Sequence, residues 1–212
     1  MISAMTSEDR LNPGRLLQSV VEQVERAGSE DVGYFGGLYE GGFQIQQRPV
    51  ELARLVCLLA SYSPFASYLE IGTAAGGTTR FLTEWLRIDR TAIIDDGNHR
   101  KYSVWVTQNS KLVPNLSEYI GDSHAPGAQV FLRELKCSFD LVGIDGDHSY
   151  PGVRADWDLV EPFLAPRAIV WFHDIRACDG VARCWSELRR RHTVLLETDE
   201  LGIGVLRHDE AV

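Results

Sequence analysis

Acidic, imidazole and hydroxyl side chains follow five apolar runs of the sequence, at the point where each run ends. The groups are Glu70-Ile-Gly-Thr-Ala-Ala-Gly-Gly-Thr-Thr79, Asp95-Asp96, Gly121-Asp-Ser-His124, Asp145-Gly-Asp-His148 and His173-Asp174. Side chains of these types bind ligands, accept protons and coordinate cations. A helix N-cap, the commonest role of an Asp or Ser after a strand, explains each group singly. Five such groups in succession favour a binding site.

The turn after the first run is rich in glycine. Small residues let a backbone approach a ligand closely, and the start of the following helix offers free amide groups. The spacing Gly72-x-x-x-Gly76 differs from the Gly-x-Gly-x-x-Gly of dinucleotide binders, which argues against a dehydrogenase. Asp95 lies 19 residues beyond Gly76, and an acid at that distance can accept both hydroxyls of a ribose.

Alternating strands and helices must position these groups. The β-rich runs predict strands at 68–71, 91–95, 117–120, 139–144 and 167–172. Amphipathic spacing predicts helices at 14–27, from Pro49 onward, and at 77–87, 100–112, 126–136, 151–164 and 179–191. This alternation predicts an α/β fold, a Rossmann-like doubly wound and mostly parallel sheet whose ligands bind at the carboxyl ends of the strands. The runs His192–Thr198 and Leu201–Arg207 predict a C-terminal antiparallel hairpin.

The chain divides in the sequence into two parts. Residues 1–48 combine the first helix with a segment, 31–47, in which five glycines alternate with aromatic residues. That segment is either a mobile lid or a plain surface loop. Residues 49–212 form the single domain that holds the polar strand ends.

Two stretches of the sequence resemble a known family. Leu69-Glu-Ile-Gly-Thr-Ala-Ala-Gly-Gly-Thr-Thr79 resembles the first motif of class I S-adenosylmethionine-dependent methyltransferases. The stretch Phe139–Trp157, with its Ile-Asp-Gly-Asp-His-Ser-Tyr, and the later Trp171-Phe-His-Asp174 are more specific. They resemble the metal-dependent small-molecule O-methyltransferases, which include catechol O-methyltransferase and the macrocin-type enzymes of macrolide sugars. The resemblance covers about residues 45 to 207 and makes 49–212 an S-adenosylmethionine-binding methyltransferase domain.

The resemblance assigns the residues of the first motif to the methionine part of the cofactor. It implies that Gly72, Thr73 and Gly76 lie against that part. Thr78 matches a hydroxyl that holds the cofactor carboxylate. Glu70 matches the acid of the motif, which acts on the loop and on the amino group of the cofactor.

The same resemblance assigns the next two strand ends to the nucleoside. Asp95 or Asp96 would hold the ribose, and Asp95 is preferred. Ser123 and His124 match positions that contact adenine, and Asp122 lies beside them.

The last two strand ends imply a divalent metal. In the relatives one acid after the fourth strand and two adjacent residues after the fifth share a cation, which assigns Asp145, His173 and Asp174. Carboxylates alone suit Mg²⁺, whereas the imidazole of His173, where relatives have an acid, shifts the preference toward Mn, Fe, Ni or Zn. His173 could also line the pocket without touching the metal. His148 matches the general base, against the alternative of a hydrogen-bonding loop residue, and Asp147 competes with Asp145 as the ligand.

The composition of the chain limits the classes of binding partner that we expect. The 212 residues carry a formal net charge of −9, and such an excess of acid counts against a nucleic-acid partner. The sequence shows no signal peptide and no apolar run long enough to cross a membrane, so we expect a cytoplasmic protein without a membrane partner. The expected partner is a small hydroxylated acceptor, and a homo-oligomer stays open.

Three functions fit these residues. The first is an S-adenosylmethionine-dependent O-methyltransferase acting on a hydroxyl of a sugar, phenol or polyketide. The second is a non-catalytic cofactor-binding or assembly protein of the same fold. The third is a metal-dependent hydrolase or oxygenase using Asp145, His148 and His173, since two imidazoles and one carboxylate match an iron site. The third function leaves the glycine-rich turn after the first strand without a role, which argues against it.

Overall fold

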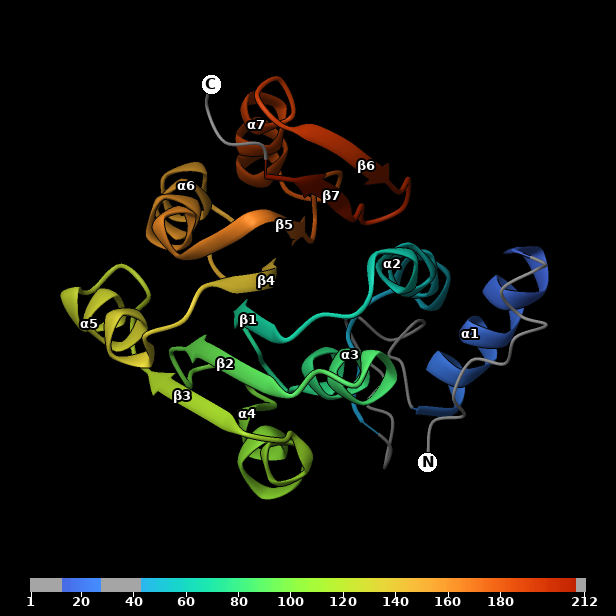
Figure 1. Ribbon diagram of the computed structural model, residues 1–212, viewed down its shortest axis with the longest axis horizontal. Coiled ribbons are helices and arrows are strands. Elements are labelled where there is room, and N and C mark those ends of the chain that lie inside the picture. The colour runs from blue at the N-terminus through green and yellow to red at the C-terminus, as the bar shows by residue number, and fades with distance from the viewer. Residues whose placement is uncertain (1–12, 28–42, 209–212) are drawn as a thin grey trace.

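One seven-stranded sheet organises the computed structural model, which describes residues 13–27 and 43–208. The strands run in the order β3-β2-β1-β4-β5-β7-β6 (Figure 1). Their bounds are β1 Ser67–Ile71, β2 Arg90–Asp95, β3 Leu116–Ile120, β4 Phe139–Ile144, β5 Leu164–Phe172, β6 Thr193–Glu197 and β7 Gly204–Arg207.

The direction of the strands confirms the predicted fold class. β1 to β5 pair in parallel, while β7 is antiparallel to both β5 and β6. The chain moves outward from β1 to β3 and then returns to place β4 on the other side of β1. In a doubly wound sheet ligands bind at this reversal, outside the carboxyl ends of the strands. The sheet is Rossmann-like, with the expected C-terminal hairpin.

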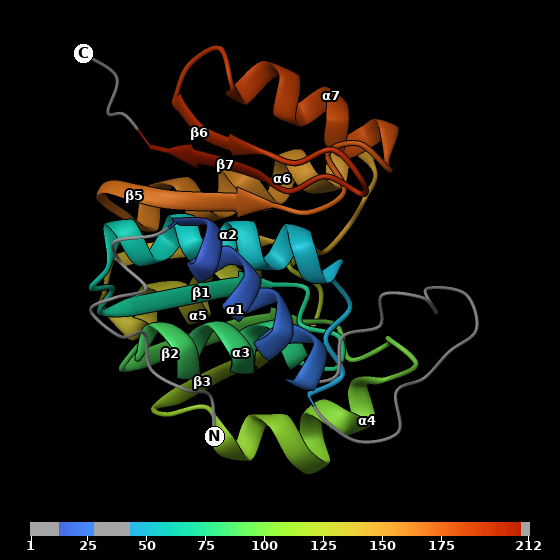
Figure 2. The ribbon, with the colours of Figure 1, turned by 90° about the vertical axis from the view of Figure 1, so that its right-hand side faces the viewer.

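Helices cover both faces of the sheet (Figures 1 and 2). α2 and α3 pack on one face, with α1 packed outside α2, and α5, α6 and α7 pack on the other face (Figure 1). Their bounds are α1 Pro13–Ala27, α2 Pro49–Tyr62, α3 Gly77–Leu86, α5 Pro126–Leu135, α6 Tyr150–Val160 and α7 Asp179–Leu188.

Alternation along the strands explains the two cores. Tyr68 and Leu141 belong to the core under α2 and α3, and their neighbours Leu69 and Val142 belong to the core under α5, α6 and α7. Successive side chains of a strand point to opposite faces, so an apolar strand contributes to both layers. The sheet is therefore buried on both sides, which leaves its carboxyl edge as the place for polar groups.

The helix predicted at 100–112 is a composite in the structure. It consists of α4 (Tyr102–Val104), a π-helical turn η2 (Trp105–Asn109) and a 3₁₀ turn η3 (Ser110–Leu112). Trp105 is fully buried and donates from its ring nitrogen to Glu118, 2.7 Å away. The side chain of Asn109 donates to the carbonyls of Phe43 and Ala75. These contacts with distant segments shape a turn that helical spacing alone does not predict.

In the N-terminal part, residues 1–48, the structure describes α1 and residues 43–48. α1 packs against α2, and Val20 and Val24 join the same core as Leu52 and Leu59. Of the segment 31–47, residues 31–42 lie outside the described part of the chain, so the lid and loop alternatives both stand. Residues 43–47 are described, and they lead directly into α2.

A buried carboxylate ties the start of α2 to the C-terminal hairpin. Glu51 is 2% exposed and accepts hydrogen bonds from the Thr198 hydroxyl and from the backbone N–H groups of residues 200, 201 and 202. Its acidic side chain thus satisfies a whole turn of backbone donors.

Among the described residues, no helix combines the length and hydrophobicity that crossing a bilayer requires.

Candidate active site

A cavity of about 680 Å³ opens at the carboxyl edge of the sheet, where the strand order reverses. Residues from the ends of β1, β2, β3, β4 and β5 line it, so the chain brings distant segments to one place. The predicted site residues in its wall are Glu70, Gly72, Thr73, Thr78, Asp95, Asp96, Asp122, Ser123, His124, Asp145, His148, His173 and Asp174. Gly76 alone of the predicted set does not line it.

The two glycines of the first turn have different tasks. Gly72 has φ +83°, and a Cβ there would overlap the carbonyl oxygen of Asp145. Glycine at this position therefore lets the loop after β1 approach the loop after β4. Gly76 has φ +75°, and a Cβ there would overlap the ring of Trp105. The absence of a side chain at Gly76 thus makes room for Trp105, and its expected contact with the ligand stays a prediction.

Asp95 shapes the glycine-rich loop. Its Oδ2 accepts from the backbone N–H groups of Thr73 and Ala74, at 2.7 and 2.9 Å, and its Oδ1 accepts from that of Gly97 at 2.8 Å. Asp96 is exposed and accepts from Asn98. Both acids line the cavity. The contact of Asp95 with a ribose stays a prediction, and the sequence did not reveal its role in fixing the loop.

The loop after β3 rests on a buried acid of α6. Asp156 is fully buried, and its Oδ1 accepts from the Ser123 hydroxyl at 2.7 Å and lies 3.2 Å from Nε2 of His124. Asp122 accepts from the backbone N–H of His124 at 2.9 Å. Burial raises the pKa of Asp156, while the hydrogen bond from Ser123 opposes the rise. Asp156 thus orients the two residues that were predicted to contact adenine.

Glu70 lies under the first turn of α3. It is 1% exposed, and the hydroxyl of Thr79 donates to its Oε2. Burial raises the pKa of Glu70 to about 8, although the hydrogen bond from Thr79 lowers it. Nearby Asp145 raises the pKa further, since two negative charges at one edge repel each other. Glu70 therefore holds a proton well above the pH at which an exposed glutamate loses one.

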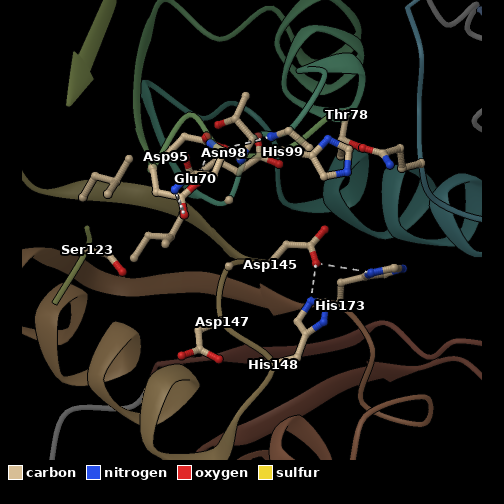
Figure 3. Close-up of a pocket in the computed structure, with 18 of the residues that line it drawn as sticks. Glu70, Thr78, Asp95, Asn98, His99, Ser123, Asp145, Asp147, His148 and His173 are labelled. Atoms are coloured by element: carbon tan, nitrogen blue, oxygen red, sulfur yellow. Dashed lines mark hydrogen bonds and ion pairs between the residues drawn. The ribbon is translucent and has the colours of Figure 1, made fainter. Parts of the chain in front are cut away.

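Four side chains meet on the side of the cavity formed by β4 and β5. Nδ1 of His173 lies 3.3 Å from Oδ1 of Asp145 and 3.4 Å from Oδ2 of Asp174. Nε2 of His148 lies 3.6 Å and 3.4 Å from the same two oxygens. Figure 3 shows the carboxylate of Asp145 facing both rings, with Asp147 turned away from them. Asp147 accepts from a backbone N–H of the turn before α6.

Charge pairing dominates the titration of this cluster. Burial alone would raise the pKa of Asp145, but the charge of His173 and hydrogen bonds from both histidines hold it at about 2. Burial alone would lower the pKa of His173, but the two carboxylates raise it to about 10. The hydrogen bond with Asp145 raises the pKa of His148 as well, against the effect of burial. The cluster thus favours an ionised Asp145 beside positively charged imidazoles.

The donor set fits a divalent cation. The ligand atoms of Asp145, His173 and Asp174 lie within 4.8 Å of one another. Adjacent ligands around a cation with bonds of about 2.0–2.2 Å lie roughly 3.0–3.5 Å apart, close to the separations seen here. Nε2 of His173 is buried without a hydrogen-bond partner among the described residues. Two carboxylate oxygens and one imidazole nitrogen suit a transition metal better than they suit Mg²⁺.

Several residues of the cavity wall escaped the sequence analysis. Gln44, Gln46 and Gln47 line it from the segment before α2, and Asn98 and His99 line it after β2. Burial and the charge of the neighbouring arginine lower the pKa of His99. The glutamines belong to the segment 31–47, which the sequence predicts to be a lid or a plain loop, so the rule that places polar groups at strand ends did not select them.

A family model and one curated protein match parts of the chain. The model, described as "Methyltransferase domain", matches residues 69–175. The uncharacterised protein y4gI of Sinorhizobium fredii is 38% identical over 72 residues, which are 32% of this chain and 8% of y4gI. The chain therefore spans less than a tenth of that relative.

Solved structures share the fold. The N-methyltransferase NodS of Bradyrhizobium japonicum, in complex with S-adenosyl-L-homocysteine, matches with a TM-score of 0.58 and 18% identity, over 90% of this chain and 99% of NodS. The O-methyltransferase TomG of Streptomyces achromogenes, involved in tomaymycin synthesis and in complex with S-adenosylmethionine, matches with a TM-score of 0.56 and 16% identity, over 97% of this chain and 100% of TomG. The resemblance of the motifs to class I methyltransferases is thereby confirmed at the level of the fold.

Proposed function

Because the chain belongs to the methyltransferase-domain family, we propose that it transfers a methyl group from S-adenosylmethionine to a hydroxyl of a small metabolite, of the sugar, phenol or polyketide type. One observation carries the proposal. A single cavity joins the glycine-rich loop and its acidic neighbours to the cluster of Asp145, His148, His173 and Asp174.

The cofactor takes the half of the cavity formed by the first three strand ends. Thr73 and Thr78 face its methionine part, Asp95 or Asp96 its ribose, and Ser123 and His124 its adenine. The loop contacts of Asp95 and the support of Ser123 by Asp156 keep these residues in place before a ligand arrives. Fixed groups lose little freedom on binding, which favours affinity. When bound, the cofactor supplies an electrophilic methyl group on a positively charged sulfur.

The acceptor takes the half formed by β4 and β5. Methyl transfer is an in-line displacement: a bond forms from the acceptor oxygen to the methyl carbon, the carbon–sulfur bond breaks, and the hydroxyl proton must leave. His148 is the proposed acceptor of that proton, since its side chain lines the cavity and is 38% exposed. A positioned base contributes roughly 10²–10⁴ in rate. Because the two halves belong to one cavity, they hold the acceptor oxygen close to the methyl carbon, which favours the displacement.

A divalent cation bound by Asp145, His173 and Asp174 would lower the pKa of the acceptor hydroxyl. An amine needs no such help to become a nucleophile once neutral, and this supports oxygen rather than nitrogen as the acceptor atom. The imidazole nitrogen of His173 supports Mn, Fe, Ni or Zn, beside Mg, as candidate ions. The acidic rim, with Asp96, Asp122 and Asp147 in the cavity wall, supports a small acceptor rather than a nucleic acid.

A thermal-shift screen with S-adenosylmethionine and S-adenosylhomocysteine, each with Mg²⁺, Mn²⁺, Zn²⁺ or chelator, tests cofactor and cation together. We expect stabilisation by the cofactor and a further increase with one of the cations. Mass spectrometry then detects methylated products in a panel of phenols, sugars and polyketides. Absence of cofactor binding in calorimetry would overturn the proposal.

Variants separate an enzyme from a binding protein of the same fold. His148→Ala and Asp145→Ala should each abolish most of the methyl-transfer activity. Asp147→Ala changes a neighbouring acid outside the cluster and should retain far more of that activity. Unchanged transfer in the first two variants would reject the proposed mechanism. Cofactor binding without any transfer across the acceptor panel would favour the non-catalytic alternative.

A further inference from the structure

We propose that Gln47 couples the two halves of the cavity, so that a cation at Asp145 and the cofactor at Thr78 strengthen each other's binding. The inference rests on the proposed function, because it needs both ligands to bind. It concerns a residue outside the motifs, on the segment that leads into α2.

Gln47 contacts both halves with the two ends of one amide. It is 3% exposed and lines the cavity. Its Nε2 donates to Oδ2 of Asp145 at 2.9 Å, and its Oε1 accepts from the hydroxyl of Thr78. These partners lie 98 and 31 residues away in the sequence, at the end of β4 and in the first turn of α3. Gln47 is the bridge between them.

The charge of Asp145 fixes the orientation of this amide. An ionised carboxylate only accepts hydrogen bonds, so the NH₂ end of Gln47 must face Asp145. The carbonyl end must then face Thr78, and the hydroxyl hydrogen of Thr78 points at Gln47. Reversing the amide would set two oxygens against each other at Asp145. The direction of the Thr78 hydroxyl therefore depends on Asp145, through Gln47.

The same contact limits how Asp145 can bind a cation. Gln47 occupies Oδ2, whereas Oδ1 faces the rings of His148 and His173. Asp145 therefore offers one oxygen, in a fixed direction, to the cluster. A cation that orders this carboxylate also orders the amide and the Thr78 hydroxyl. Because its hydrogen points at Gln47, the Thr78 hydroxyl meets the cofactor as an acceptor, which suits the ammonium of the methionine part rather than the carboxylate. The cofactor then meets an ordered contact, and the converse holds with the same factor, because coupling between two binding sites is reciprocal.

Calorimetry measures this coupling directly. S-adenosylhomocysteine is titrated into the full chain with and without MnCl₂, and MnCl₂ is titrated with and without S-adenosylhomocysteine. Couplings between sites are typically about 5-fold to 150-fold, and we expect Mn²⁺ to tighten binding of S-adenosylhomocysteine by roughly 5-fold or more. Gln47→Met keeps the length of the side chain and loses both polar atoms, so the factor should fall to below about 2-fold, under the usual range.

Gln46→Met is the matched control. Gln46 is the adjacent glutamine of the cavity wall, and we expect its variant to retain the wild-type coupling factor. Circular dichroism first establishes that each variant is folded, and Gln47→Leu, also without polar atoms, replaces Gln47→Met if that variant does not fold. Loss of coupling in the Gln47 variant alone supports the inference.

Two results overturn the inference while leaving the proposed function standing. One is independent binding of the two ligands in the wild type. The other is a coupling factor that the Gln47 variant leaves unchanged. Failure of the wild type to bind S-adenosylhomocysteine at all is a different result, and it overturns the proposed function together with the inference.

Discussion

Nδ1 of His173 lies 3.3 Å from Oδ1 of Asp145, so a nearly buried imidazole faces a carboxylate at the centre of the cavity's second half. The resemblance to metal-dependent O-methyltransferases leads one to expect an acid at position 173. Here the position carries a nitrogen donor instead. The cluster thereby holds one negative charge fewer than an all-carboxylate site would hold.

The first prediction concerns the choice of cation. His173→Asp replaces the nitrogen donor with an oxygen donor and should shift the ratio of Mg²⁺ to Zn²⁺ affinity toward Mg²⁺ by roughly tenfold, since hard cations prefer oxygen. Calorimetry with each ion measures the ratio. Asp147→Asn, outside the cluster, should leave it unchanged. An unaltered ratio in His173→Asp would mean that His173 does not coordinate the ion.

A second prediction concerns the charge of Asp145. Asp145→Asn keeps the shape of the side chain but removes the negative charge that faces both histidines. Methyl transfer should fall by about 10² or more, the scale of a lost acid–base or cation contribution, while S-adenosylhomocysteine still binds. Single-turnover rates and calorimetry separate the two effects. If only the affinity for the cofactor changed, Asp145 would belong to the cofactor half.

A third prediction follows from Glu70, whose pKa is about 8 in the folded protein and ordinarily 4.5. Between these values the folded state holds a proton that the unfolded state has lost. The free energy of unfolding must therefore fall as the pH rises through this window, by at most about 1.4 kcal/mol per pH unit from this group. Below pH 4.5 both states are protonated, and the contribution is constant.

Glu70→Gln should remove this part of the pH dependence. Urea unfolding between pH 5 and pH 8 should give a flatter profile for the variant than for the wild type, because the amide cannot ionise. Glu134→Gln, at an exposed position, should keep the wild-type slope. Parallel profiles for Glu70→Gln and the wild type would show that Glu70 is ionised in the folded protein.

A fourth prediction compares two glycines with nearly equal dihedral angles. Gly76 and Gly97 have φ +75° and +73°, so alanine is strained at both. At Gly97 the nearest atom to a new Cβ lies 3.4 Å away, whereas at Gly76 the Cβ would overlap the Trp105 ring. Gly97→Ala should cost about 1–2 kcal/mol from strain alone. Gly76→Ala should cost about 1–3 kcal/mol more from overpacking, as measured by urea unfolding. Equal costs would contradict the packing of Trp105 against the loop.

A fifth prediction concerns Glu51. Glu51→Ala leaves the buried N–H of Gly202 and the buried hydroxyl of Thr198 without their acceptor, and each such group costs about 1–3 kcal/mol. The free energy of unfolding should therefore fall by about 3 kcal/mol or more. Glu134→Ala, on an exposed helix surface, should change it by no more than about 0.5 kcal/mol. Similar values for the two variants would show that the hairpin turn finds other acceptors.

The sequence predicted most of the fold because its signals are local. Apolar runs of strand length, separated by amphipathic stretches, identify β1 to β5 and the helices between them, and Thr193–Glu197 and Gly204–Arg207 form the expected hairpin. The helix at 100–112 was predicted with regular geometry. Its π-helical turn depends on Trp105 and Asn109, whose partners lie in other segments, and such contacts leave no local pattern.

The site was predictable to the extent that it follows from topology. Parallel strands bring their carboxyl ends to one edge, so polar residues after the strands had to line one cavity. Gln47 and Asp156 escaped this reasoning because their tasks arise from partners 98 and 33 residues away. The contact of Gly76 with the ligand stays a prediction, and no local pattern indicated that the missing side chain makes room for the Trp105 ring.

The carboxylate of Glu51 also has a consequence for how the chain is made. Its partners follow it by 147 to 151 residues, and β7, which completes the sheet between β5 and β6, is the last strand. At a synthesis rate of about 5–20 residues per second, the interval is on the order of ten seconds. Throughout that time α2 carries an acid without its donors, and β5, once it has been made, has an open edge until β7 follows. The sheet of the nascent chain thus stays incomplete, and open to unwanted pairing, until β7 has left the ribosome.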